Sequence, residues 1–428
     1  MAEIKAFKGF RYTEKAGDIG QLCCPPYDII SPEQHEALIF RNKYNFVRLE
    51  LPVMGGCGDM SPYKGSAEHL RFWIDQDIMR RDEQECIYIY EMAFNTSGSN
   101  YTVKGFISLV KLEPFEKGVI LPHEETLHRA KSDRLNLMKA TGSNFSQIYS
   151  LYMDEDGSVF DLINAASQAA PDSEFTDDEN VTHRLWCVSD PAVISAVAAK
   201  MSDKKLYIAD GHHRYETALN YQQYVEKNLD EIGTSDYVTM MMVNMENSGL
   251  VVFPTHRIVH DLFHFDYNEV CEKCREYFTV TPYLNREKGE QGLEKAYAEG
   301  RKAFVLFTGD NNYTLLELND INVMEKLMPS SSKALRELDV TVLHTLILER
   351  IFGIGKDSLA NQTNLTYTRS ADEALATVDG QRANCAFLLN PTRVSEIRDV
   401  AAAGEKMPQK STYFYPKLTT GLVINKIF

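Results

Sequence analysis

The feature that most constrains the fold is the stretch of residues 206–218, LYIADGHHRYETA. Residues 206–209 form an apolar run long enough for a buried strand, and Asp210-Gly211 interrupts it. From His212 onward, apolar residues recur at three- and four-residue spacing, which predicts a helix. A strand, a glycine turn and a helix start bring backbone N–H groups and the positive end of a helix dipole together, which favours a bound anion.

The first turn of this predicted helix carries His212, His213 and Arg214. Cations are unfavourable at a helix N-terminus unless an anion lies nearby, so these residues indicate a phosphate or carboxylate ligand. A structural interpretation also exists: Asp210 as an N-cap, Gly211 as a turn residue, and histidines that are exposed or satisfied in the core. The sequence favours the ligand site, because all these residues meet at one junction.

Length and charge limit the class of protein. A chain of 428 residues and 48.7 kDa is long for one core, so two or more domains are expected. The formal net charge of -16 argues against a general nucleic-acid binder. No run approaches the ~20 apolar residues of a membrane span. The charged start lacks the apolar region of a signal peptide, so we predict a cytoplasmic protein without membrane contact.

The cysteines do not predict a metal centre. Cys271 and Cys274 form a Cys-x-x-Cys pair, but the sequence contains no second pair of this kind. His260 and His264 lie upstream and leave a mixed site open. The favoured interpretation is two reduced cysteines on a helix, with no bound metal.

The N-terminal region predicts a loop followed by a helix. A Pro-Pro pair enforces extended backbone, and Ser31 with Gln34 forms a capping box that starts a helix running to about Phe40. Tyr27 and Asp28 are then placed on the loop before the helix, where binding residues are common. A rigid connector with an exposed aspartate is the alternative.

Alternating polarity predicts several strands. Residues 45–51 alternate, so we expect a half-buried strand with Arg48 and Glu50 projecting on one face. Further strands are expected at 86–94, 103–111, 144–152, 185–188, 237–243 and 250–253. Polar loops predict that 86–94 and 103–111 form one hairpin and that 237–243 and 250–253 form another.

Two further groups of residues suggest chemistry. His123, Glu124, Thr126 and Arg129 lie in one dense polar stretch, which is typical either of a charged surface helix or of a site. In a site, Glu124 would be a general base, Thr126 would contact substrate, and the His and Arg would balance phosphate charge. Arg257 follows a strand and would make a second phosphate contact or cap the sheet.

The remaining chain predicts a second part with mixed helices and strands from about Asp261. We expect domains at 1–260 and 261–400, and a segment 401–428 that docks near the site. This last segment combines aromatic, hydroxyl and basic residues. Lys410 and Lys417 would hold an anion there, with Ser411 and Thr412 adding hydroxyl donors; a structural strand is the alternative.

Five sequence blocks resemble one known family. The blocks PPYD, PHEET, DRL, ADGHHRYETA and MPQKSTYFYPK are similar to those of the family catalogued as domain of unknown function 1015, from Phe7 to about Val423. The family has no activity to carry over.

The central turn resembles that of the ParB/sulfiredoxin-like superfamily, which includes free-serine kinases. The resemblance implies an α+β fold, mixed sheets with packed helices, in which a nucleotide-binding core is joined to a second α/β part. It also implies a nucleotide or pyrophosphate held at Gly211 to Arg214. Two departures matter: the chain has no Walker motif, and His212 stands where the reactive cysteine of sulfiredoxin would be.

The sequence therefore predicts a phosphotransferase for a small hydroxylated metabolite, with serine or phosphoserine tested first. Mg²⁺ with ATP, ADP or pyrophosphate would be the co-substrate. We expect Asp210, His212, His213 and a carboxylate such as Glu124 to be catalytic, with Asp28, Glu50 and Asp210 as other bases. A phosphoester hydrolase and a nucleotide-binding regulatory protein without turnover are the alternatives. No nucleic-acid partner is expected, and a homodimer is left open.

Overall fold

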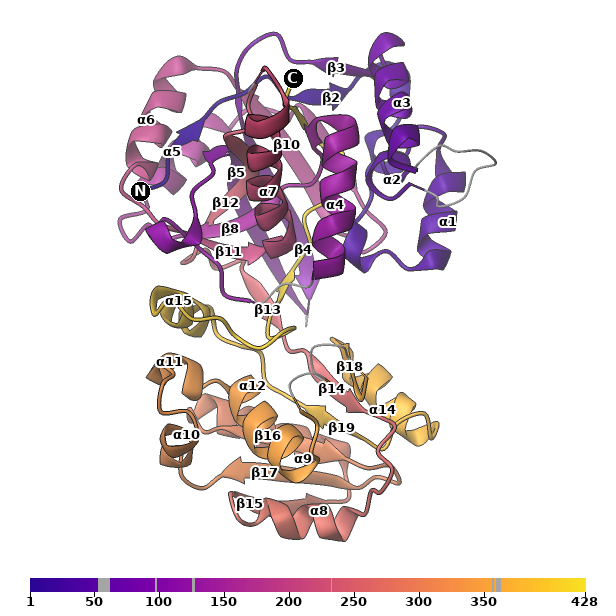
Figure 1. Ribbon diagram of the computed structural model, residues 1–428, viewed down its shortest axis with the longest axis vertical. Helices are drawn as coiled ribbons and strands as arrows, with labels where there is room; N and C mark the ends of the chain where they lie inside the picture. Colours follow the sequence, from indigo (N-terminus) through magenta and orange to yellow (C-terminus); the bar gives the residue numbers. More distant parts are fainter. Residues whose placement is uncertain (53–61, 97, 125–127, 232, 356–357, 359–362) are drawn as a thin grey trace. The chain divides into compact units, whose positions relative to one another are not determined.

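The computed structural model describes residues 1–52, 62–96, 98–124, 128–231, 233–355, 358 and 363–428 (Figure 1). The chain divides into two compact units. Unit 1 comprises Met1–Pro122, Thr126–Leu250 and Pro416–Phe428, and unit 2 comprises His123–Glu125 and Val251–Tyr415. Each unit is described by itself.

Unit 1 is built on a mixed sheet. Within the described ranges this sheet has nine strands in the order β6-β11-β8-β12-β5-β4-β10-β9, with β1 paired to β5. Small two-stranded sheets join β2 to β3 and β7 to β21. The strands are β1 (Ile4–Lys5), β2 (Phe10–Tyr12), β3 (Met79–Arg81), β4 (Ile87–Thr96), β5 (Ser99–Lys111), β6 (Ile120–Leu121), β7 (Ser143–Asn144), β8 (Ile148–Tyr152), β9 (Ser173–Thr176), β10 (Thr182–Val188), β11 (Leu206–Asp210), β12 (Tyr237–Asn244) and β21 (Asn425–Lys426).

The helices α5 (Ser158–Ala166), α6 (Pro191–Met201) and α7 (His212–Asn228) pack on this sheet. The other helices of unit 1 are η1 (Glu14–Ala16), η2 (Ile19–Gln21), η3 (Tyr27–Ile29), α1 (Pro32–Arg41), α2 (Val47–Glu50), α3 (Pro62–Asp75), η4 (Phe115–Lys117) and α4 (His128–Thr141). Alternate residues of β12, Met240 and Met242, share one core with Val159 of α5, Val197 of α6 and Tyr215 of α7. In Figure 1, α4 and α7 lie side by side. Apolar side chains from one face of the strand, which recur every second residue, therefore pack against apolar side chains from one face of each helix, which recur every three or four residues.

A second core in unit 1 forms around α1, α2 and α3. Trp73 is buried there together with Phe46 and Leu70. The predicted capping box is confirmed: the Ser31 hydroxyl accepts from the Gln34 backbone N–H, and the Gln34 side chain accepts from the Ser31 N–H. This cap fixes where α1 begins and leaves Tyr27 on η3 before it.

The predicted strand at residues 45–51 is wrong, because Val47–Glu50 is a one-turn helix, α2. The Asn45 side chain accepts from the Val47 N–H at 3.0 Å, which starts the turn. Val47, Leu49 and Glu50 are all buried. The alternation of residue types therefore did not reflect two faces of a sheet. Arg48 and Glu50 do not share a strand face.

The first predicted hairpin is confirmed, and the second is wrong. β4 pairs with β5 in antiparallel register from Tyr88–Ile107 to Thr96–Ser99. By contrast, β12 pairs with β5 and β8, while β13 (Val251–Phe253) pairs with β20 (Tyr413–Tyr415). The turn signal was real, but the strand after it found its partner near the other end of the chain.

Unit 2 contains a second mixed α/β layer. Within the described ranges its main sheet has six strands in the order β15-β17-β16-β19-β14-β18. The strands are β13, β14 (His256–Val259), β15 (Phe278–Tyr283), β16 (Ala303–Phe307), β17 (Tyr313–Leu318), β18 (Leu365–Thr368), β19 (Cys385–Leu388) and β20. The helices are α8 (Tyr267–Cys274), α9 (Arg286–Ala298), α10 (Asn322–Leu327), α11 (Lys333–Arg336), α12 (Asp339–Val342), the π-helix η5 (Leu343–Ile351), α14 (Ala371–Asp379) and α15 (Val394–Ala402). Leu293 of α9 and Leu375 of α14 pack against Val305 of β16.

The division of the chain differs from the predicted boundaries. The sequence placed a boundary after residue 260, whereas the contacts divide the chain after Leu250. The reason is that β13 and β14 pair with β20, β18 and β19, which belong to unit 2. The predicted segment 401–428 is also divided, since it belongs to unit 2 up to Tyr415 and to unit 1 from Pro416. Among the described helices, none combines the length and the apolar character that a membrane crossing requires.

The C-terminal residues pack tightly into unit 1, which leads to a stability prediction. Gly421 has a φ of +106°, and an added Cβ would lie 3.0 Å from the Cβ of Phe46. Gly17 also has a positive φ, +96°, but nothing lies within 4 Å of its added Cβ. Gly17 has a ψ of -152°, in a region that is nearly restricted to glycine, so we expect Gly17→Ala to cost about 1–3 kcal/mol of backbone strain. Gly421→Ala should cost about 1–3 kcal/mol more from overpacking. The free energy of unfolding of each variant is measured in urea with tryptophan fluorescence as the signal, because Trp73 and Trp186 both lie in unit 1. Equal losses for the two variants would contradict it.

Candidate functional site

The predicted strand–turn–helix junction is present in unit 1. β11 ends at Asp210, Gly211 adopts the left-handed conformation with φ 93° and ψ 27°, and α7 begins at His212. Gly211 stands at the N-cap position of this helix and has no side chain that could bond to the first N–H groups. An added Cβ on Gly211 would lie 2.9 Å from Nε of Arg214, so the guanidinium folds back over the turn. Only glycine combines this backbone conformation with so close an approach.

One carboxylate joins two cations at this turn. Oδ2 of Asp210 accepts from Nη2 of Arg214 at 2.6 Å, and Oδ1 accepts from Nζ of Lys417 at 2.7 Å. Nη1 of Arg214 donates to the backbone carbonyl of Gln147. The C-terminal segment therefore closes onto the turn through Lys417, within unit 1.

The charges of this cluster control the ionisation of Asp210. Burial opposes the charged form, but Lys417 and Arg214 outweigh it and hold the pKa of the carboxyl below its usual range. Asp210 is therefore a carboxylate at neutral pH. A group with such a low proton affinity is a poor general base.

A second buried ion group lies beside the turn in unit 1. Arg134 is 6% exposed, and its Nη1 donates to the backbone carbonyl of Glu50 at 2.8 Å and to Oε1 at 3.4 Å. Its guanidinium carbon lies 4.1 Å from the ring centroid of Tyr27. Although burial disfavours its charge, Glu50 and Asp133 raise the pKa of Arg134. Arg134 therefore stays charged in the interior.

A cavity of about 40 Å³ lies between these two groups, lined among others by Glu50, Arg134, Ser146, Arg214 and Thr217. Oε1 of Glu50 accepts from the Ser146 hydroxyl at 2.7 Å. Oε2 of Glu50 and Oγ1 of Thr217 are buried without a hydrogen-bond partner among the described residues. Buried polar atoms normally have partners, so these atoms indicate a place for a ligand or a water molecule.

Several predicted residues meet in this cluster. Asp210, Gly211, Arg214 and Lys417 form its centre. Tyr27 lies close enough to Arg214 and Arg134 that both lower the pKa of its hydroxyl, although burial raises it overall. His212 is buried in the first turn of α7, and His213 is half-buried next to it. Asp28 is exposed on η3 and raises the pKa of Tyr27.

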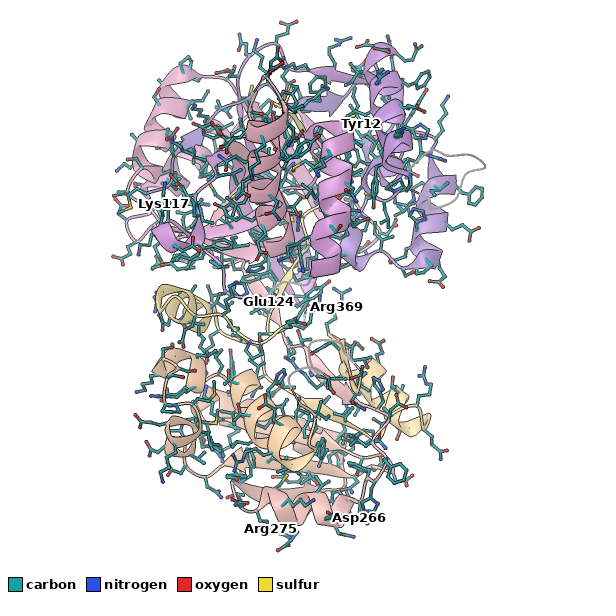
Figure 2. All side chains as sticks on the ribbon, in the orientation of Figure 1. Tyr12, Lys117, Glu124, Asp266, Arg275 and Arg369 are labelled. Atoms are coloured by element: carbon teal, nitrogen blue, oxygen red, sulfur yellow. The ribbon has the colours of Figure 1, made fainter. Side chains whose placement is uncertain are left out.

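Most of the other predicted residues belong to unit 2: His123, Glu124, Arg257, Lys410, Ser411 and Thr412. His123 is buried, and its Nε2 lies 3.0 Å from Oγ1 of Thr412. Oε1 of Glu124 accepts from the backbone N–H of Lys410 at 2.6 Å. Glu124 is labelled in Figure 2.

Two more of these unit 2 residues, Ser411 and Arg257, are buried. Ser411 is buried, and its hydroxyl donates to the Pro408 carbonyl, so it supports the local turn. Arg257 is fully buried on β14, and its neighbour His256 accepts from the Leu389 N–H at 3.2 Å. Thr126 lies outside the described residues.

The Cys-x-x-Cys pair of the sequence lies on one helix of unit 2. Cys271 and Cys274 both lie on α8 as free, buried thiols. Within the described ranges, no three His, Cys, Asp or Glu side chains are grouped so that they would hold a metal ion.

Most of the chain matches one protein family. Residues 4–341 match the family described as "Protein of unknown function (DUF1015)". The chain belongs to this family. No curated protein matches the sequence.

Solved structures with partial similarity include three of interest. A conserved hypothetical protein from Pyrococcus furiosus is 14% identical with a TM-score of 0.36, over 73% of this chain and 92% of that chain. A free serine kinase in complex with AMP is 13% identical with a TM-score of 0.35, over 75% and 93% of the two chains. SbnI with a C-terminal truncation, from Staphylococcus aureus, is 11% identical with a TM-score of 0.38, over 75% and 87%. Family membership is therefore what the comparisons establish.

Sequence reasoning missed part of the unit 1 cluster. Arg134 and Ser146 were not selected, and Glu50 was assigned to a strand. The signal for Arg134 was available, because it stands in the DRL block of the family resemblance. Ser146 carries no such signal, and only its hydrogen bond to Glu50 reveals it.

The ion group at Asp210 leads to a prediction about stability and pH. We expect Asp210→Asn to lower the free energy of unfolding at pH 7 by about 3 kcal/mol, because Arg214 and Lys417 would lose their common partner. The pKa of Asp210 is depressed in the folded protein, so its contribution is complete above the unfolded-state pKa of about 4 and is lost as the pH falls below that value. The difference between the two proteins should therefore shrink on acidification. Tryptophan fluorescence during urea unfolding measures it, and a difference that does not change with pH would contradict the assignment.

Proposed function

We propose that the chain is a phosphotransferase that moves a phosphoryl group from a nucleotide or pyrophosphate to the hydroxyl of a small metabolite. The observation that carries the proposal is the convergence of Arg214 and Lys417 on the uncapped start of α7. Phosphoryl transfer depends mainly on positioning and on positive charge around the phosphates, and these residues supply both. We also propose that unit 1 is a ParB/sulfiredoxin-like nucleotide-binding core.

The donor phosphates would bind at the turn. The first N–H groups of a helix have no partners within the helix, and Gly211 adds no side chain that would cover them. Arg214 and Lys417 would exchange part of their interaction with Asp210 for phosphate oxygens. Mg²⁺ would reach the site on the nucleotide, held chiefly by phosphate oxygens and supplying charge neutralisation. His212 and His213 stand in the same turn and would contact the phosphates.

Glu50 is the general base that the geometry favours. Asp210 is committed to two cations, Asp28 is exposed, and Oε1 of Glu124 already accepts from the backbone N–H of Lys410. Glu50 has one oxygen fixed by Ser146 and a second without a partner among the described residues. Its carboxylate would take the proton of the acceptor hydroxyl as that oxygen bonds to phosphorus and the bond to the leaving phosphate breaks. The cavity of about 40 Å³ beside it fits a hydroxymethyl group.

Binding is the first test. The midpoint of thermal unfolding is measured in the presence of ATP, ADP, pyrophosphate, phosphate, serine or phosphoserine, each with and without Mg²⁺. A ligand of the native state raises the midpoint by mass action, so a nucleotide or pyrophosphate should raise it. Arg214→Ala should abolish this shift, while Arg80→Ala, which removes an exposed guanidinium of unit 1, should leave it unchanged.

The outcomes separate the alternatives. A shift with phosphate or phosphoserine alone would favour a hydrolase. Nucleotide binding without phosphoryl transfer to any acceptor would favour a regulatory protein. A folded Arg214→Ala protein with unchanged affinity would refute the anion site. Serine, as the acceptor, and phosphoserine, as the product of transfer or the substrate of a hydrolase, are tested first because the central turn resembles that of free-serine kinases.

Glu50→Gln tests the base. The amide keeps the shape of the side chain but cannot accept the proton, so we expect turnover to fall by about 10²–10⁴-fold. Nucleotide affinity should stay close to that of the unaltered protein, because the side-chain hydrogen bonds of Glu50 within the described residues come from Arg134 and Ser146 and not from Arg214. Transfer to serine is measured with a radiolabelled nucleotide under single-turnover conditions. Undiminished transfer by Glu50→Gln would rule this residue out as the base.

A further inference from the structure

Unit 2 contains a cavity that the proposed phosphotransferase site does not use. Its volume is about 430 Å³, within the range of about 300–1,000 Å³ typical of small-molecule sites. Apolar side chains such as Met328 and Met407 line it together with the polar side chains of Thr341 and His344. All of its lining residues belong to unit 2.

The wall of this cavity has an unusual backbone. Leu343–Ile351 forms a π-helix, η5, which carries His344. Its end shows the wider hydrogen bond, since the N–H of Phe352 donates to the carbonyl of Ile347, five residues earlier, at 2.9 Å. π-Helical turns are rare and occur frequently at functional sites.

Two polar atoms in this wall have no hydrogen-bond partner among the described residues: Nε2 of His344 and Oγ1 of Thr341. The side chains are 6% and 3% exposed. A buried hydroxyl or imidazole nitrogen without a partner costs about 1–3 kcal/mol. Two such groups lining one cavity indicate that a ligand group supplies the missing partners.

A buried arginine stands behind this wall. Arg257 is 0% exposed, and its guanidinium carbon lies 5.1 Å from the ring centroid of its cross-strand neighbour Tyr367, which lines the cavity. Burial lowers the pKa of Arg257 to about 10 despite the opposing effects of Tyr367 and Glu124. Burial, and after it the charge of Arg257, lower the pKa of His344 well below its usual value, so this imidazole is neutral. The arginine is therefore a buried cation whose charge its neighbours do not fully compensate.

The free edge of this arginine suits an anion. Nη1 donates to the carbonyl of Thr255, whereas Nε and Nη2 have no partner among the described residues. The N–H bonds of Nε and Nη2 lie along one edge of the guanidinium plane and point the same way. That arrangement matches the two oxygens of a carboxylate or phosphate.

We propose that this cavity binds a small organic anion with an apolar body, whose charged end is received by Thr341, His344 and Arg257. The apolar body lies against the methionine-containing part of the wall. The ligand is a carboxylate or a phosphate monoester, since both present the oxygens that these donors require. This site is additional to the phosphotransferase site and does not depend on it.

The test uses methyl NMR of the full chain labelled at methionine with ¹³C. Hexanoate, hexyl phosphate and hexan-1-ol are titrated, with the resonances of Met328 and Met407 assigned by Met→Leu substitution and Met240 of β12 as the internal reference. We expect saturable shifts of Met328 and Met407, with at least one of the two anions binding about tenfold or more tightly than the alcohol, a difference of about 1.4 kcal/mol. Whichever anion binds more tightly identifies the charged group.

Two matched variants locate the polar end. Thr341→Val removes a hydroxyl without a partner, so it should keep or raise stability while weakening anion binding. Thr345→Val makes the same change in the same wall, but that hydroxyl already donates to Sδ of Met328 at 3.6 Å, so anion affinity should change little. Arg257→Met should remove the preference for the anion over the alcohol.

Several results would overturn this site. They are methionine resonances that do not move, equal affinity for hexanoate, hexyl phosphate and hexan-1-ol, or equal losses in Thr341→Val and Thr345→Val. Arg214→Ala, in unit 1, should leave hexanoate binding unchanged. The failure of one site is therefore distinguishable from the failure of the other.

Discussion

The interaction on which unit 1 depends is the shared carboxylate of Asp210. It holds Arg214 of α7 and Lys417 of the C-terminal segment, and so it joins the end of β11, the start of a helix and the last residues of the chain. Gly211 makes the arrangement feasible, because its positive φ lets the guanidinium of Arg214 fold over the turn. The same ion group concentrates charge where the helix dipole already favours an anion. Stability and the proposed binding role thus rest on the same atoms.

The interiors of the two units keep polar groups that a purely structural core would avoid. In unit 1, Glu50 and Arg134 are both buried, and they are tolerated because they pair with one another and are hydrogen-bonded. In unit 2, Arg257 and His344 are buried with fewer partners among the described residues. Burying such groups is costly in free energy, so their retention points to ligands rather than to stability.

Much of the secondary structure was predictable, because the signals for it are local. The Ser31 capping box marks the start of α1, the Asp-Gly turn separates β11 from α7, and a polar loop joins β4 to β5. Prediction failed where a distant contact outweighed the local pattern. Residues 45–51 alternate like a strand, yet Val47–Glu50 forms a helical turn in which Val47, Leu49 and Glu50 are all buried. β13 follows a hairpin signal but pairs with β20, far along the chain.

The sequence by itself determined the mixed α/β character, the strand–glycine–helix turn with Arg214, and the family to which the chain belongs. It also predicted that the C-terminal segment docks near the central turn, where Lys417 pairs with Asp210. Only the tertiary structure decided that Lys410 and Lys417 belong to different units, that Glu50 and Arg214 line one cavity, and that Arg257 lies next to Tyr367 of a cavity wall. The physical reason is that hydrophobic periodicity, caps and turns act over a few residues, whereas ion pairs and cavities join side chains that are distant in sequence.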